Sequence, residues 1–132
     1  LNTLARQRTL DGILVEGKKA ARHIKQGFLG HARELEAVLK WTKDSPYPVI
    51  LCGDFNETPY SYVYGKTRSL LHNAFEEKGH GFGFTYNQIP YFIRIDHQFY
   101  DQTKLKLLNF ETLGSVRFSD HNPLIGTYKI NH

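Results

Sequence analysis

The feature that most constrains the fold of this chain is a short apolar run that leads directly into polar residues. Val49–Cys52 follows Pro48 and precedes Gly53–Asn56. Proline ends any helix before the run, and four apolar residues between turn residues are typical of a strand buried on both faces. We therefore expect a core strand that turns out of the sheet at the glycine. Asp54 and Asn56 would then lie at the strand's C-terminal end.

Two further motifs place ionisable side chains in strand-like or loop segments. Arg94–His97 lies inside Phe92–Tyr100, where the alternation of polar and apolar residues predicts a strand with Asp96 on its polar face. His97 points to the other face of that strand, and we expect it to be structural. The third motif, Ser119–His121, lies near the C-terminus.

The remaining segments give simpler expectations. His31 falls on the apolar face of a predicted helix, and we interpret it as a buried histidine rather than a ligand. The predicted elements are a helix ending near Lys43 with Ile24, Phe28, Leu35 and Val38 on one face, short helices over Tyr60–Tyr64 and Leu70–Lys78, a glycine-rich connection over Gly79–Gly83, and strands over Leu105–Leu113 and Leu124–Ile130.

Composition narrows the class of protein. Cys52 is the single cysteine, so no internal disulfide forms, and its place in the apolar run predicts a small buried side chain rather than a nucleophile. No stretch of this piece approaches the roughly 20 apolar residues of a membrane span. The chain contains no Met and begins at Leu1, so we expect a piece of a longer protein.

Positive charge is concentrated in the N-terminal third. Residues 1–44 contain nine Lys and Arg against five Asp and Glu, whereas residues 45–132 contain eight of each. A basic segment beside a carboxylate-bearing one suits a phosphorylated or polyanionic substrate. The same charges are also typical of an ordinary solvated helix face.

Phosphate ester hydrolysis needs an oriented water, a charge clamp on the phosphoryl oxygens and help for the leaving oxygen. Together the three motifs supply side chains for these tasks. Asp54 can align the water, and Asn56 can donate to a phosphoryl oxygen. Asp120 can bind a hard divalent cation. His121 can contact the phosphoryl group or exchange a proton, and Asp96 can fix its tautomer.

Taken singly, each motif also has a purely structural explanation. Gly53 and Asp54 form a common turn sequence, and Ser119–His121 can be a loop closed by a side-chain cap. Asp96 can pair with Arg94 or with another surface cation. The order of the three motifs along the chain favours the functional interpretation.

In that order the motifs resemble the endonuclease/exonuclease/phosphatase superfamily, which has the deoxyribonuclease-I-like fold. The likeness covers about residues 27–130 and is closest to a bacterial branch of that superfamily. The matching segments are Pro48–Pro59, Ser61–Tyr64, Thr85–Tyr86, Arg94–His97 and Ser119–Pro123. The resemblance implies an α+β fold, a four-layer α/β/β/α sandwich. Residues 1–132 would be the C-terminal portion of that single domain, with about one mixed sheet and its flanking helices.

The resemblance also implies site roles. Catalytic roles fall to Asp54 on the water, Asn56 on the phosphate, Asp96 orienting His121, and His121 on the scissile phosphate or in proton transfer. Asp120 would help to bind Mg²⁺ or Mn²⁺. The first half of such a domain would add an Asn, the main metal-binding Glu and another phosphate ligand, and none of these has a match here. We therefore expect this piece to be nearly inactive by itself.

Several alternatives remain open. The leading hypothesis is a fragment of a metal-dependent phosphoesterase, and its substrate would be a nucleic acid, a phospholipid head group or a sugar phosphate. The alternative is a non-catalytic module that binds phosphate or nucleic acid. A structural domain with incidental motifs requires three ordered coincidences. A fragment with about one sheet leaves an apolar face that the missing N-terminal half would cover. We therefore expect the fragment to dimerise, to pair with that half or to expose an apolar patch.

Overall fold

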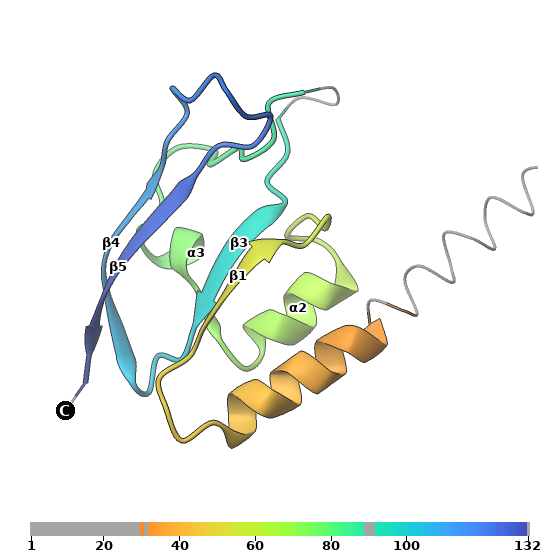
Figure 1. Ribbon diagram of the computed structural model, residues 1–132, viewed down its shortest axis with the longest axis vertical. Coiled ribbons are helices and arrows are strands. Elements are labelled where there is room, and N and C mark those ends of the chain that lie inside the picture. Colours follow the sequence, from red (N-terminus) through yellow and green to blue (C-terminus); the bar gives the residue numbers. More distant parts are fainter. Residues whose placement is uncertain (1–29, 31, 89–91, 132) are drawn as a thin grey trace, which may run out of the picture. The chain divides into compact units, whose positions relative to one another are not determined.

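The computed structural model of the chain describes residue 30 and residues 32–88 and 92–131. The chain divides into two compact units, Leu1–Glu36 and Ala37–His132, and the elements labelled in Figure 1 all belong to the second. A helix runs over residues 32–44, so the helix expected to end near Lys43 is present. Ile24, Phe28 and His31, which the sequence placed on that helix, lie outside the described residues.

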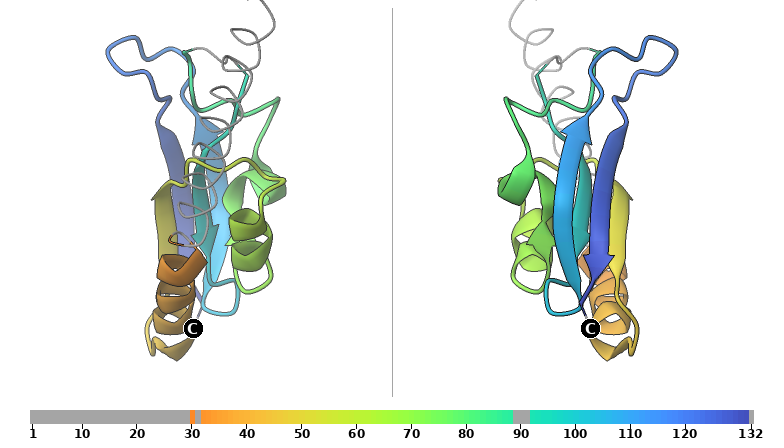
Figure 2. Two further views of the ribbon diagram at one scale, coloured as in Figure 1. Left: turned by 90° about the vertical axis from the view of Figure 1, so that its right-hand side faces the viewer. Right: turned by 90° about the vertical axis from the view of Figure 1, so that its left-hand side faces the viewer.

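The strands of the second unit form two antiparallel sheets. The first has the order β1-β3-β2, from β1 (Ile50–Asp54), β3 (Asp96–Tyr100) and β2 (His72–Asn73). The second is a hairpin of β4 (Leu105–Thr112) and β5 (Leu124–Ile130), and the right-hand view of Figure 2 shows it in front of β3. The expected α+β class is confirmed. The described residues nevertheless form two small antiparallel sheets rather than about one mixed sheet, because the last two strands pair with each other.

Among the described residues, two hydrophobic clusters cover opposite faces of the three-stranded sheet. One, between β3 and the hairpin, contains Tyr100, Leu105, Leu107 and Phe110, together with Ala74 at the start of α3 (Ala74–Lys78). The other contains Tyr64, Leu71 and Phe99 and lies on the side of α2 (Tyr62–Arg68). In Figure 1 the hairpin and α2 accordingly lie on either side of β1 and β3.

The helices begin where side-chain caps allow. Ser61 accepts a hydrogen bond from the backbone of Tyr64 and so starts α2 later than the expected residue 60. Asn73 accepts from the backbone of Glu76 and starts α3. The helix expected over 70–78 is therefore shortened, because His72 and Asn73 pair with β3 as a strand. No described helix has the length and apolar character needed to cross a membrane.

The prediction that the strand over Val49–Cys52 is buried on both faces is wrong. β1 begins at Ile50, whose side chain is 44% exposed, and Cys52 is exposed rather than buried. Among the described residues β1 is an edge strand that pairs only with β3, and Leu51 is its one residue that packs against a described core cluster. Gly53 does not turn the chain out of the sheet but continues β1 opposite His97.

Candidate active site

The register of β1 against β3 brings two of the predicted site residues together. Asp54 lies directly opposite Asp96 at the end of the ladder, and residues directly opposite each other in an antiparallel pair point to the same face. Figure 1 shows the two strands side by side. His121 reaches the same place from the segment between β4 and β5, where it forms an isolated bridge with Tyr86.

Asp96 and His121 form the shortest contact in the site. The Nδ1 atom of His121 lies 2.8 Å from Oδ2 of Asp96, within hydrogen-bond range. A carboxylate only accepts, so Nδ1 donates and the other ring nitrogen, Nε2, faces Asp54 Oδ2 at 4.0 Å. Arg94 takes no part, because its guanidinium lies over the ring of Phe75 at 3.9 Å. The alternative ion pair between Arg94 and Asp96 is therefore absent.

The acidic surroundings of His121 favour its charged form. The hydrogen bond to Asp96 raises the pKa of the imidazole, and partial burial opposes that rise only in part. The negative charges of Asp96, Asp54 and Asp120 raise the pKa further. With a side chain about 30% exposed, His121 is a partly solvated imidazole whose Nε2 is open toward Asp54.

The loop after Asp54 has a fixed conformation. Asn56 has a φ of 50°, in the left-handed region that asparagine tolerates better than most residues. Its backbone N–H donates to Oδ1 of Asp54 at 2.8 Å, so one oxygen of this carboxylate is already used. Asn56 is exposed, and the loop displays it next to Asp54.

Asp120 lies in the same loop as His121 but outside the closest group of ligand atoms. Two hydrogen bonds hold the loop: the Asp120 carbonyl accepts from Asn87 N at 2.9 Å, and the Ser119 side-chain Oγ accepts from His121 N at 3.1 Å. Asp120 is exposed, and its charge contributes to the raised pKa of His121. The structure thus brings Asp54, Asp96 and His121 together, with Asn56 and Asp120 displayed beside them.

Thr85 is a buried residue that links two of the segments carrying the candidate site. It is completely buried, and its hydroxyl oxygen accepts from the backbone N–H groups of Ile95 at 3.0 Å and Asp96 at 3.1 Å. Its carbonyl accepts from Asn122 N at 2.7 Å. Thr85 therefore connects the start of β3 to the loop that carries His121. Only its place in the family-like Thr85–Tyr86 pair could have indicated it from sequence.

The three clustered side chains also form a candidate cation site. Asp54, Asp96 and His121 each offer one ligand atom, and these atoms lie within 4.8 Å of one another. Carboxylate oxygens suit hard divalent cations. The imidazole suits them less, because its Nδ1 already donates to Asp96 and hard divalent cations prefer oxygen to nitrogen ligands. The carboxylates therefore fit such a cation better than His121 does.

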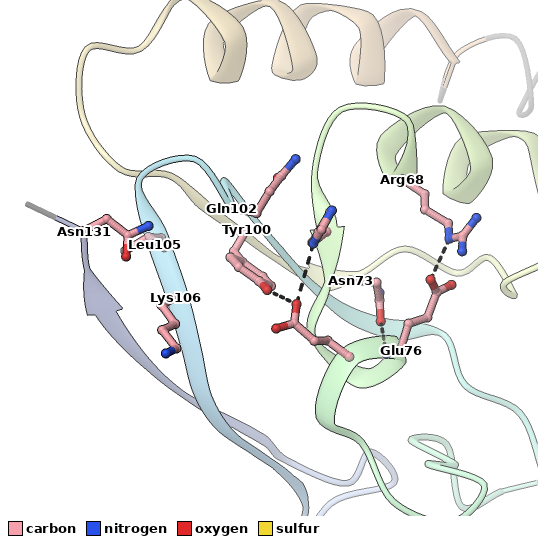
Figure 3. Close-up of a pocket in the computed structure, with 10 residues that line it drawn as sticks. Arg68, Asn73, Glu76, Tyr100, Gln102, Leu105, Lys106 and Asn131 are labelled. Atoms are coloured by element: carbon pink, nitrogen blue, oxygen red, sulfur yellow. Dashed lines mark hydrogen bonds and ion pairs between the residues drawn. The ribbon is translucent and has the colours of Figure 1, made fainter.

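Two grooves differ in their relation to this site. One of about 370 Å³ borders Asp96 and His121 and is otherwise lined mainly by Cys52, Gln98, Phe118, Pro123 and Leu124. A larger one of about 700 Å³ lies near α3 and contains none of the predicted site residues. Figure 3 shows Arg68 paired with Glu76, whose Nε and Oε2 atoms lie 2.6 Å apart. Of these two grooves, only the smaller one borders residues of the candidate site.

Comparison with known proteins gives one match. Residues 18–121 match the Endonuclease/Exonuclease/phosphatase family, a span that includes all three motifs and most of the chain. No curated protein and no solved structure matches the chain.

Proposed function

The chain belongs to the endonuclease/exonuclease/phosphatase family, and from that premise we propose that it carries much of the catalytic site of a metal-dependent phosphoesterase. Members of this family are generally hydrolases that act on phosphoester bonds and typically depend on a divalent metal. The observation that carries the proposal is the meeting of Asp54, Asp96 and His121, which come from three separate segments of the chain.

His121 and Asp96 have the arrangement of a proton donor and the group that orients it. Asp96 holds Nδ1–H at 2.8 Å, so the protonated ring directs Nε2–H to the open side of the site. There the imidazolium can donate to a phosphoryl oxygen or to the leaving oxygen as charge develops. Asp96 acts through His121 and stabilises its charged form.

Asp54 and Asn56 have complementary roles on the other side of the site. Asp54 Oδ1 accepts from the loop backbone, which leaves Oδ2, 4.0 Å from His121 Nε2, to align an attacking water or accept its proton. Asn56 is neutral, so its carboxamide can donate to a non-bridging phosphoryl oxygen without adding repulsion. Each residue thus performs a task that the other cannot.

The cation in this proposal is Mg²⁺ or Mn²⁺, and the carboxylate of Asp120 would help to hold it beside the Asp54 and Asp96 carboxylates of the candidate cation site. When bound, such a cation neutralises charge on the phosphoryl oxygens. A site with few carboxylates holds Mg²⁺ weakly, because Mg²⁺ keeps much of its water and relies on substrate oxygens. We accordingly propose that the residues 1–132 are the C-terminal portion of a larger catalytic domain and are nearly inactive alone.

Exposed apolar side chains on the strands support the idea of a larger domain. Ile50 on β1 and Leu108 on β4 are 44% and 47% exposed, and Ile125 and Ile130 on β5 are 47% and 54% exposed. Missing strands of the same domain, or a second copy of the chain, would cover such residues.

Substrates that suit the site include a nucleic acid, a phospholipid head group and a sugar phosphate.

The test is hydrolysis by the intact natural protein. Bis(4-nitrophenyl) phosphate and 4-nitrophenyl phosphate are offered as a generic diester and monoester over a range of Mg²⁺ and Mn²⁺ concentrations. We expect turnover that EDTA abolishes and that added Mg²⁺ or Mn²⁺ restores. Turnover that survives EDTA contradicts the metal-dependent proposal. Phosphate binding without any turnover favours the alternative, a module that binds phosphate or nucleic acid.

A further inference from the structure

His97 is a buried titratable residue for which the proposed chemistry has no use. It is 2% exposed, although it directly follows Asp96 in β3. Successive side chains of a strand point to opposite faces, so its ring lies on the face away from His121. There it packs edge-on against Tyr64 at 4.8 Å and Phe55 at 5.5 Å between ring centroids.

The hydrogen bond of His97 defines its tautomer. Nε2 lies 3.0 Å from the carbonyl oxygen of Glu57, and a carbonyl only accepts, so Nε2 carries the hydrogen. Nδ1 is buried without a partner among the described residues. A hydrogen on Nδ1 would therefore be an unsatisfied buried donor, which is costly. Burial also lowers the pKa of His97, in keeping with a neutral ring.

This bond closes a loop that begins at the active site. Phe55 N donates to Ile95 O at 2.9 Å, and Asn56 N donates to Asp54 Oδ1 at 2.8 Å. The next residue, Glu57, is held by His97. Asn56 therefore lies between fixed points on both sides, in a left-handed conformation with a φ of 50° that is costly for most residues.

We propose that His97 is a positioning residue that holds the loop so that Asn56 is presented beside Asp54. The inference rests on the proposed function, in which Asn56 donates to the phosphoryl oxygen. A donor that is displaced by about 1 Å can lose on the order of a hundredfold in rate, so a fixed loop has a direct catalytic value. A residue that merely fills the core would need the shape of the ring but not its Nε2–H donor.

Two substitutions separate shape from donor. His97→Phe keeps an aromatic ring and removes the hydrogen bond, whereas His97→Gln places an amide N–H near the original Nε2 position. Phe99→Leu is the matched control, because Phe99 packs against Phe55, Tyr64 and the His97 ring but has no polar side-chain atom to bond the loop. Each variant is made in the intact protein, with measurements of unfolding free energy, kcat and KM on bis(4-nitrophenyl) phosphate.

We expect His97→Phe to lower kcat by about tenfold or more with a much smaller change in KM, because the Asn56 contact strengthens as charge develops in the transition state. His97→Gln should restore kcat to within about threefold of wild type. Phe99→Leu should lose stability and keep its kcat. If His97→Phe retains wild-type kcat, or if His97→Gln is as slow as His97→Phe, His97 only fills the core.

A measurement on the unsubstituted protein keeps the inference testable if a variant does not fold. Long-range ¹H–¹⁵N NMR correlations report which ring nitrogen of His97 carries the hydrogen. The Nε2–H tautomer is expected, and an Nδ1–H tautomer overturns the inference. Failure of the proposed function is a separate result, since it appears as absence of metal-dependent turnover by the wild-type protein.

Discussion

Replacing Asp96 with Asn removes the negative charge beside His121 while it preserves the size of the side chain. The carboxamide oxygen can still accept from Nδ1, so the position of the ring is retained. What is lost is the charge that raises the pKa of His121 and stabilises its imidazolium. The substitution therefore tests whether Asp96 contributes charge or only geometry.

The magnitude follows from the length and type of the bond. At 2.8 Å between His121 Nδ1 and Asp96 Oδ2, the contact is a charge-assisted hydrogen bond. Hydrogen bonds to charged groups contribute about 1.5–3 kcal/mol. The carboxamide keeps a neutral hydrogen bond worth about 0.5–1.5 kcal/mol, so about 1–1.5 kcal/mol of charge assistance is lost; if the transition state needs it, the reaction slows by roughly 5- to 15-fold.

The assay combines kinetics with an NMR titration of His121. We expect Asp96→Asn to lower kcat within the range above and to make His121 titrate at lower pH than in the wild-type protein. Asp101→Asn is the control, because Asp101 accepts from Thr103 and lies near Lys104, away from the site. A wild-type rate in Asp96→Asn, or a His121 pKa that does not fall, refutes the role of the carboxylate.

Three further predictions concern other parts of the molecule. Desolvation raises the pKa of Glu76, but its hydrogen bonds and nearby cations lower it by more, so its folded-state pKa is lowered. The stability that Glu76 contributes should therefore be present at neutral pH and lost as the pH falls below about 4.5. In urea unfolding over this pH range, Glu76→Gln should lose less stability than the wild-type protein. Gly83→Ala should destabilise the fold by about 1–3 kcal/mol in thermal unfolding, since Gly83 has a φ of 61° and its Cβ would collide with the Phe75 ring. Asp120→Ala should raise the Mg²⁺ concentration needed for half-maximal activity, whereas an unchanged Mg²⁺ dependence would remove Asp120 from the cation site.

Local sequence patterns predicted those helices and strands that follow from the residue types within the segment itself. The strand predicted over Leu124–Ile130 has both of its expected bounds, and the strand expected over 105–113 ends one residue earlier in the structure. The prediction that β1 is buried on both faces was wrong, because an apolar run does not reveal whether its strand lies at the centre or the edge of a sheet. Which strands pair depends on the whole chain, so it cannot be deduced from the four residues Val49–Cys52 alone.

The candidate site shows the same division. Asp54, Asp96 and His121 were identifiable because carboxylates and an imidazole lie in three ordered motifs, and the antiparallel register then places them together. Thr85 acts only through one hydroxyl and its backbone, and many buried threonines do the same without any function. The role proposed for His97 depends on a carbonyl 40 residues away, which no local pattern contains.

The most direct test of the central claim is the rate of His121→Ala in the intact protein, measured at saturating Mg²⁺ with a diester and a monoester. Removing this group should reduce hydrolysis by roughly a hundredfold or more, the scale expected for loss of a general acid or of a group that stabilises charge. Asp54→Asn should give a loss of similar size. If His121→Ala turns over like the wild-type protein, the group formed by Asp54, Asp96 and His121 is not a phosphoesterase active site.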